Sequence, residues 1–196
     1  IVGGRFGYVI FYNPEYFINH PFDVIKIWQG GMSFHGGLLG LIVAVVFFSK
    51  NKNVDPLIFL DVISCVAPLG LFLGRISNFI NAELYGKPTE FYFSVIFPNI
   101  DEIPRHASQI YEAILEGLVL FIILNYIIHK KNYVRGFTSS LFLILYGTFR
   151  IICEQFREPD SQIGYLFDLV SMGSALSILM IAAGSYLFIK YKNDRS

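Results

Sequence analysis

The stretch that decides the fold is residues 56–80, PLIFLDVISCVAPLGLFLGRISNFI. Asp61 and Arg75 carry the only charges in it, and Leu, Ile, Val and Phe make up more than half of the rest. About 20 mostly apolar residues are enough for a helix to cross the hydrocarbon core of a bilayer. The sequence therefore predicts a membrane-spanning helix here, with an acidic residue near its start and a basic residue near its end.

The composition of the whole chain agrees with this interpretation. Of 196 residues, 54% are hydrophobic and 15% are charged, and the mean hydropathy is +0.54. Soluble domains carry about 25% charged residues, so the composition excludes a nucleic-acid-binding protein, a disordered chain and a disulfide-stapled secreted domain. Cys65 and Cys153 each lie in an apolar stretch, which is typical of small buried hydrophobic residues and not of a zinc site or a disulfide.

Further apolar stretches predict an all-α, polytopic helix bundle that forms one transmembrane domain over residues 1–196. The predicted spans are a partial one at 1–12 and complete ones at 32–49, 56–80, 108–128, 137–156 and 165–189. Residues 82–105 are more polar and contain three prolines. We expect them to form a small head region outside the membrane.

The distribution of Lys and Arg among the loops predicts the topology, because cytoplasmic loops are enriched in these residues. One set of alternate loops holds eight of them, namely Lys50, Lys52, Lys130, Lys131, Arg135, Lys190, Lys192 and Arg195. The opposite set holds four, namely Lys26, Lys87, Arg105 and Arg157. The first set is therefore predicted to lie in the cytoplasm, and the head region on the outer side.

Ionisable residues gather at the outer ends of the predicted spans. An ionisable residue within a span costs about 2.5–3.5 kcal/mol on insertion scales and suggests a function by default. These residues are His35, Arg75, Glu83, His106, Glu112, Arg150, Glu154 and Arg157. Their convergence predicts a polar cavity that opens on the outer leaflet.

Helical spacing sorts the polar residues into stripes. One helix face is predicted to carry Tyr146, Arg150, Glu154 and Arg157, a second Arg75 and Asn78, and a third Gln109, Glu112 and Glu116. Internal salt bridges, such as one between Arg150 and Glu154, are the alternative explanation. Three stripes at one membrane level favour a site.

Two pairs of glycines flank His35, in the sequence Gly30-Gly31-Met-Ser-Phe-His35-Gly36-Gly37. A histidine near a helix N-terminus tends to stay neutral, and a neutral histidine can act as a base. A histidine that only forms a hydrogen bond within the bundle is the alternative.

Two arginines, an asparagine and a histidine at one level are typical of a phosphate-recognising site, because the guanidinium group binds phosphate with two parallel hydrogen bonds. In a membrane the abundant phosphate is the lipid head group. The sequence has no Gly-rich phosphate loop and no DxxxD motif in its polar loop. We therefore expect an intramembrane lipid-modifying enzyme without nucleotide, Mg²⁺ or another metal.

Four motifs resemble the bacterial prolipoprotein diacylglyceryl transferase family. They are GMSFHGGL (31–38), GRISNFINAELYG (74–86), RHASQIYEAILEG (105–117) and YGTFRIICEQFREPD (146–160). The resemblance implies a seven-helix plasma-membrane protein with an external head region and an outward-facing site, whose first helix would precede Ile1. It implies transfer of the diacylglyceryl group of phosphatidylglycerol to the lipobox cysteine of a preprolipoprotein, forming a thioether and releasing glycerol 1-phosphate. No metal or organic cofactor is implied.

The resemblance also assigns roles to individual residues. The catalytic residues it implies are His35, Arg75 and Arg150, and the substrate-binding residues are Arg75, Asn78, Glu83, Gly86, His106, Tyr146 and Glu154. We expect His35, or else His106, to take the proton of the lipobox thiol, while the two arginines hold the phosphate. The chain departs from the family pattern at Ser77, Ala107, Ser174 and Leu179, where Gly, Pro, Gln and Pro are usual. None of these changes removes a group expected to act in catalysis.

Two alternatives to a transferase stay open from the residues alone. An intramembrane lipid phosphatase or phosphotransferase would need a phosphohistidine nucleophile or carboxylates arranged for a metal. A transporter or scaffold with a polar core would favour paired broken helices, and the sequence gives no sign of these.

Overall fold

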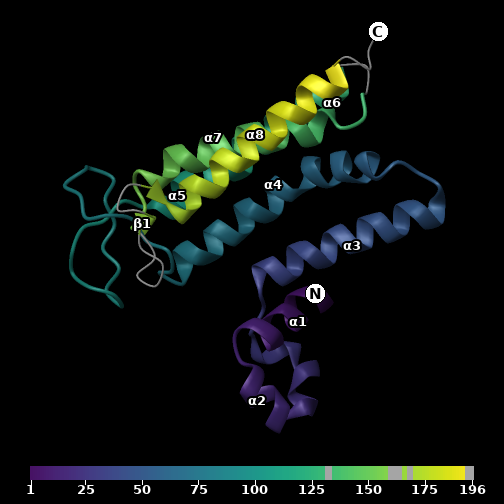
Figure 1. Cartoon of the computed structure of the whole chain (residues 1–196). Helices are drawn as coiled ribbons and strands as arrows, with labels where there is room; N and C mark the ends of the chain where they lie inside the picture. The colour runs from purple at the N-terminus through teal and green to yellow at the C-terminus, as the bar shows by residue number, and fades with distance from the viewer. Residues whose placement is uncertain (131–133, 159–164, 167–169, 193–196) are drawn as a thin grey trace. The chain divides into compact units, whose positions relative to one another are not determined.

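The computed structural model describes residues 1–130, 134–158, 165–166 and 170–192 (Figure 1). The chain divides into two compact units, Ile1–Phe59 and Leu60–Ser196, and each is described by itself. Helices dominate both units.

The first unit is built on two helices, α1 (Val2–Phe11) and α3 (Phe34–Lys52). Between them lie α2 (Pro14–Asn19) and two short 3₁₀ helices, η1 (Pro21–Ile25) and η2 (Ile27–Gln29). Glycines form the contact between α1 and α3, since a Cβ atom on Gly7 would lie 2.7 Å from the Cα atom of Gly36. Small residues allow this close approach of two helix backbones.

Arg5 of α1 is buried and fixes the loop that leads into α3. Its guanidinium group donates hydrogen bonds to the carbonyl oxygens of Asp23 (2.6 Å), Val24 (2.9 Å) and Gly31 (3.0 Å). The helix then begins with a side-chain cap, because the Ser33 hydroxyl oxygen accepts a hydrogen bond from the Gly36 amide at 3.2 Å. Such caps satisfy one of the free amides of the first helical turn.

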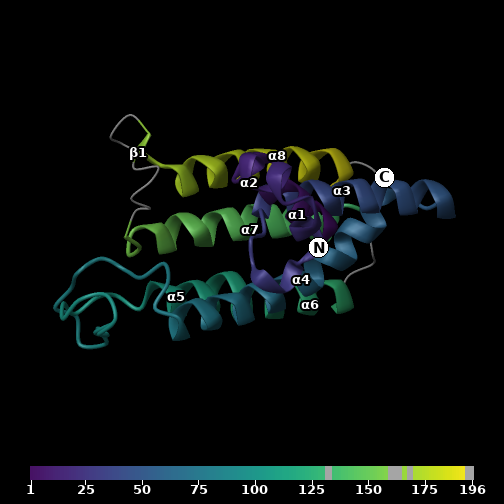
Figure 2. The same ribbon diagram turned by 90° about the horizontal axis from the view of Figure 1, so that it is seen from below.

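The second unit contains the longer apolar helices. Its elements are most of α4 (Pro56–Ile80), then α5 (Ser108–Glu112), the π-helical turn η3 (Ala113–Val119), α6 (Leu120–Lys130), α7 (Phe137–Glu154), β1 (Tyr165–Leu166), β2 (Val170–Ser171) and α8 (Met172–Lys192). The segments α5, η3 and α6 follow one another as one continuous helix. Figure 2 shows α7 between α8 and this helix.

Within the described part of the chain, four helices are long and apolar enough to cross a membrane. They are Pro56–Ile80, Ser108–His129, Phe137–Glu154 and Gly173–Tyr191. The all-α membrane class is therefore confirmed, whereas the count of five complete spans plus a partial one and the single domain stay predictions. Helices α1 and α3 occupy the predicted spans at 1–12 and 32–49.

One predicted boundary is wrong, and a second lies close to its expected place. The last span does not begin at residue 165, because Tyr165 pairs with Ser171 and Leu166 with Val170 in a short antiparallel ladder, and α8 begins at Met172. The span predicted to end at residue 156 ends at Glu154, where the chain leaves the helix in a turn.

Glycines also mediate the packing of the second unit. A Cβ atom on Gly147 would lie 2.8 Å from the Ser177 carbonyl oxygen, and one on Gly184 would lie 2.8 Å from that of Ser140, so α7 and α8 approach closely. Between α4 and η3, a Cβ atom on Gly117 would lie 2.6 Å from the Cβ atom of Phe72.

Asp61, the acidic residue of α4, is fully buried and caps the start of α7. Its carboxylate accepts hydrogen bonds from the amide of Gly136 (2.6 Å) and from the amide (2.7 Å) and hydroxyl (2.6 Å) of Ser139. A buried carboxylate needs such partners to offset its desolvation. This contact ties one end of α4 to the start of α7.

The predicted head region contains no helix, and short backbone pairings hold it together. Arg105 and Val95 exchange hydrogen bonds of 2.9 and 3.0 Å, and the His106 amide donates to the Lys87 carbonyl oxygen at 3.0 Å. The Arg105 guanidinium group is buried over the Tyr85 ring and pairs with Asp101 at 2.7 Å. This hydrogen-bonded pair lowers the pKa of the Asp101 carboxyl group below its usual value.

Candidate active site

Three arginines from separate parts of the second unit converge on the carboxylate of Glu112. The Arg75 Nε atom lies 3.0 Å from Glu112 Oε2, the Arg157 Nη1 atom lies 3.4 Å from Glu112 Oε1, and Arg150 Nη1 contacts the same Oε1 atom. The Glu112 side chain is fully buried. Glu112 is therefore the centre of the cluster.

Two further carboxylates complete this ion cluster, which we define as Arg75, Glu112, Glu116, Arg150, Glu154 and Arg157. Glu116 lies 3.4 Å from Arg75 and 3.6 Å from Arg150, and Glu154 lies 2.8 Å from Arg150. Three positive and three negative groups thus share one buried volume. Mutual pairing is what makes buried charges tolerable at low dielectric.

The local fold explains how Arg75 reaches these carboxylates. Gly117 on η3 has no side chain to separate it from Phe72 on α4, so the two segments nearly touch. Arg75 follows Phe72 by three residues, and Glu116 directly precedes Gly117. Glu112 and Glu116 flank the start of a π-helical turn, a distortion that is frequent at functional sites.

The structure brings Arg75 and Arg150 together as the spacing predicts, with Glu154 and Tyr146 on either side of Arg150 along α7. Glu154 forms an ion pair with Arg150, which is the internal salt bridge given above as the alternative explanation of this polar stripe. Tyr146 is half-buried, and its ring stacks on Phe142 at a centroid distance of 5.6 Å.

The residues that follow α4 shape the backbone beside the cluster. The Asn78 carbonyl oxygen accepts a hydrogen bond from the Glu83 amide at 2.8 Å, and the Gln109 side chain donates to the Glu83 carbonyl oxygen at 2.8 Å. The Glu83 side chain is exposed and joins none of the ion pairs of the cluster. Gly86 allows a close backbone approach, since a Cβ atom there would lie 2.8 Å from the Phe156 carbonyl oxygen.

Of the two histidines predicted for the site, only His106 has a side chain that the structure describes. The backbone of His35 lies in the first turn of α3, in the first unit, and its side chain lies outside the described residues. His106 is half-buried, and its Nδ1 atom lies 3.4 Å from the Tyr111 hydroxyl oxygen. Its ring contacts that of Phe156 at a centroid distance of 5.2 Å.

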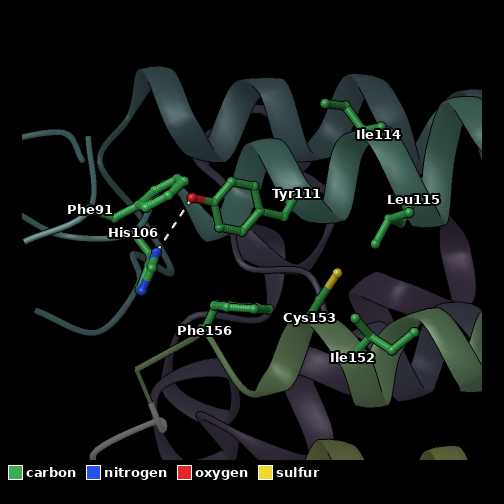
Figure 3. A pocket seen from close by; sticks show the side chains of 8 residues that line it. All are labelled: Phe91, His106, Tyr111, Ile114, Leu115, Ile152, Cys153 and Phe156. Carbon is green, nitrogen blue, oxygen red and sulfur yellow. Dashed lines mark hydrogen bonds between the residues drawn. The ribbon is translucent and has the colours of Figure 1, made fainter. Parts of the chain in front are cut away.

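His106 and Tyr111 line a cavity of about 390 Å³ beside the cluster (Figure 3). The remaining lining residues are Phe91, Ile114, Leu115, Ile152, Cys153 and Phe156. Tyr111 and Cys153 directly precede Glu112 and Glu154 in the sequence. The sequence predicts a polar cavity, whereas this one is apolar, because the charged side chains pair with one another.

One prediction about a helix face is wrong. Arg157 does not share the face of Arg150 on α7, because the helix ends at Glu154. Arg157 forms an isolated β-bridge with Gly86 and reaches Glu112 from the chain beyond the helix.

Three members of the cluster, Glu112, Glu116 and Arg157, have no catalytic or binding role assigned from the sequence. The sequence predicts both glutamates in a polar stripe, and Glu112 also among the ionisable residues that converge on a cavity. Both are fully buried at the centre of the cluster. Two carboxylates four residues apart within one apolar span are the signal that points to them. Among the residues that the structure describes, no group of three or more His, Cys, Asp or Glu side chains is arranged to hold a metal ion.

Comparison with known proteins identifies the family. The profile of the prolipoprotein diacylglyceryl transferase family matches residues 1–190. A phosphatidylglycerol–prolipoprotein diacylglyceryl transferase of Rickettsia akari is 53% identical over 189 residues, which are 95% of this chain and 73% of that protein. A protein of the same name from Rickettsia bellii is 51% identical over 97% of this chain and 73% of its own length. Another from Methylocella silvestris is 51% identical over 94% of this chain and 68% of its own length. With this identity over nearly its whole length, the chain belongs to the prolipoprotein diacylglyceryl transferase family.

Proposed function

We propose that the ion cluster around Glu112 binds the phosphate of phosphatidylglycerol. The protein is a transferase that moves the diacylglyceryl group of this lipid to a prolipoprotein, as its relatives are named. The observation that carries the proposal is that Arg75 and Arg150, on different helices, share the carboxylate of Glu112. Two guanidinium groups held so close together suit the oxygens of one phosphate.

The burial of the cluster supports this assignment. The side chains of Arg75 and Arg150 keep 15% and 12% of their surface exposed, whereas Glu112 and Glu116 keep none. A ligand would therefore meet the arginines and not the carboxylates. The glutamates offset the cost of burying the arginines and hold them in place, and a bound phosphate would share the guanidinium donors with them.

The proposed reaction is a displacement at the glyceryl carbon next to the phosphate. The sulfur of the prolipoprotein cysteine forms a bond to this carbon, and the carbon–oxygen bond to the phosphate breaks, with its electron pair leaving on glycerol phosphate. The arginines would stabilise the charge that develops on the leaving group. One such donor contributes about 2.7–4 kcal/mol in other enzymes.

The thiol proton needs an acceptor, since a cysteine with a pKa of about 8.5 is mostly protonated at neutral pH. We assign this role to His35 and name His106 as the second candidate. His106 is supported by its place beside the cluster, where it lines the apolar cavity with Tyr111. Asn78, Glu83 and Tyr146 would orient the head group or the arginines.

The apolar cavity would accept an acyl chain of the bound lipid. Its volume of about 390 Å³ falls within the range of about 300–1,000 Å³ of small-molecule pockets. The loop charges support an orientation in the bacterial inner membrane in which the cluster and the head region face the outer leaflet.

A single assay tests the proposed function. The purified protein is incubated with acyl-labelled phosphatidylglycerol and a lipobox peptide, and we expect labelled peptide together with glycerol phosphate. Release of diacylglycerol would instead indicate a phosphatase, and unchanged lipid would indicate a protein that is not an enzyme.

The same assay tests the phosphate site. Lysine keeps the charge of arginine but loses its two-pronged geometry, so Arg75→Lys and Arg150→Lys should each lower transfer steeply. Arg135→Lys, an exposed arginine outside the cluster, is the matched control. Near-normal transfer by both cluster variants would contradict the proposed site.

A further inference from the structure

Three consecutive aromatic residues of the head region, Phe91, Tyr92 and Phe93, are strongly exposed. Their exposed fractions are 52%, 90% and 67%. The rings contact one another, with centroid distances of 5.7 Å between Phe91 and Phe93 and 5.1 Å between Tyr92 and Phe93. We call these three residues the aromatic tip. A contiguous exposed apolar patch of this kind marks an interaction site.

The base of the tip is held firmly. The Thr89 amide donates to the Pro104 carbonyl oxygen at 2.9 Å, and the Val95 amide donates to that of Arg105 at 2.9 Å. The Arg105 side chain is itself buried and paired with Asp101. The tip is thus a short loop on a braced base, so its exposure is a fixed feature of the head region.

The head region connects two consecutive candidate spans. The head region joins the end of α4 at Ile80 to the start of α5 at Ser108, and both helices belong to candidate spans. Both ends of the segment therefore lie at the same face of the membrane. The Phe91 ring contacts that of His106, two residues before α5, at a centroid distance of 6.3 Å.

The charge around the tip argues against an electrostatic partner. Between Lys87 and Arg105 the sequence has no basic residue and three acidic ones, Glu90, Asp101 and Glu102. A polyanion or a strongly anionic surface would be repelled. Phe, Tyr and Trp side chains favour the boundary between lipid head groups and hydrocarbon without any need for charge.

We propose that the aromatic tip inserts into the interface of the bilayer and anchors the head region there. Phe91 also lines the apolar cavity, so an inserted tip would place the mouth of the cavity against lipid. The proposal rests on the membrane-spanning helices and not on the transfer reaction.

Fluorescence tests the proposal, because the chain has a single tryptophan, Trp28. In a Trp28→Phe background, Tyr92→Trp places the only tryptophan in the tip, and Asn99→Trp places it at another exposed position of the head region. Both proteins are reconstituted in phosphatidylcholine nanodiscs with lipids brominated on their acyl chains. We expect blue-shifted emission from Tyr92→Trp and quenching several-fold stronger than that of Asn99→Trp. Adding Phe93→Asp should bring the quenching down to the level of the control.

Two results would overturn the proposal. One is equal quenching of the Tyr92→Trp and Asn99→Trp proteins, with both equally open to an aqueous quencher. The other is protection of Tyr92→Trp from the aqueous quencher only after a lipobox peptide is added, which would make the tip a peptide-binding surface. Transfer activity is measured in parallel, so lipid quenching in an inactive protein would count against the proposed function alone.

Discussion

Replacing Glu112 with Gln should destabilise the second unit more than any other single loss of a carboxylate from the ion cluster. Glu112 contacts Arg75, Arg150 and Arg157, whereas Glu116 makes two longer contacts and Glu154 pairs with Arg150 alone. The substitution preserves the shape of the side chain but leaves three largely buried arginines facing two carboxylates. Removing one partner of a buried ion pair typically costs about 3–5 kcal/mol.

This free energy corresponds to a measurable fall in melting temperature. For a chain of about this size, 1 kcal/mol shifts Tm by about 2–4 °C, so Glu112→Gln should lower Tm by roughly 6–20 °C. Thermal unfolding in detergent micelles, followed by far-ultraviolet circular dichroism, measures the shift. Glu116→Gln should show a smaller fall, and Glu90→Gln, at an exposed position of the head region, should show almost none.

The order of the three variants is the critical result. A Glu112→Gln protein that melts with the Glu90→Gln control would refute the claim that Glu112 holds the arginines together. A Glu116→Gln protein less stable than Glu112→Gln would move the centre of the cluster to Glu116. The first outcome would also remove the basis for placing the lipid phosphate between Arg75 and Arg150, whereas the second would not, because Glu116 contacts both arginines.

Three further predictions concern the base, the topology and the head region. If His35 is the general base, His35→Gln should lower the transfer rate about 10²–10⁴-fold. Part of the rate should return as the pH approaches the thiol pKa of about 8.5. A folded variant that keeps most of its activity across a pH series would leave His106 as the candidate base. A cysteine at Lys87, in a variant without the native cysteines, should react with an impermeant maleimide in intact spheroplasts, and labelling only after lysis would reverse the topology. Because Arg105 lowers the pKa of Asp101 in the folded protein, the pair should stabilise the head region above the usual carboxyl pKa, and this stabilisation should disappear as the pH falls through the lowered value. Amide exchange in the head region at decreasing pH measures the loss, and Asp101→Asn should remove the pH dependence; an unchanged dependence would count against the pair.

The sequence was sufficient to predict the convergence of Arg75 and Arg150. An arginine is costly inside an apolar span, so both had to find polar partners at the ends of their helices. The identity of those partners depends on which helix faces which, and the close contact of Gly117 with Phe72 decides this. Spacing along one helix contains no such information, and for this reason the sequence places Glu112 in a stripe and among the converging ionisable residues but does not identify it as the partner of the arginines.

The two corrected features are caused by backbone pairing, which helical spacing does not report. Arg157 continues the spacing of Tyr146, Arg150 and Glu154, yet backbone pairing with Gly86 takes the chain out of the helix before it. The residues before Met172 are as apolar as a span, but a short ladder uses their backbone hydrogen bonds. In both places the backbone pairs with another segment and does not continue a helix. Arg157 pairs with Gly86, which is far away in the sequence, and Tyr165 and Leu166 pair with Ser171 and Val170.

The contact of Asp61 with the start of α7 has a consequence for how this sequence can vary in length. Asp61 and Arg75 are separated by 14 positions on α4, or about 21 Å along the helix axis, and each residue turns the helix by about 100°. With Asp61 bound to Gly136 and Ser139, a single inserted or deleted residue between the two would swing Arg75 away from Glu112. The number of residues between them is therefore constrained as strictly as their identities, and we expect an added alanine there to abolish the cluster even though it would suit a helix.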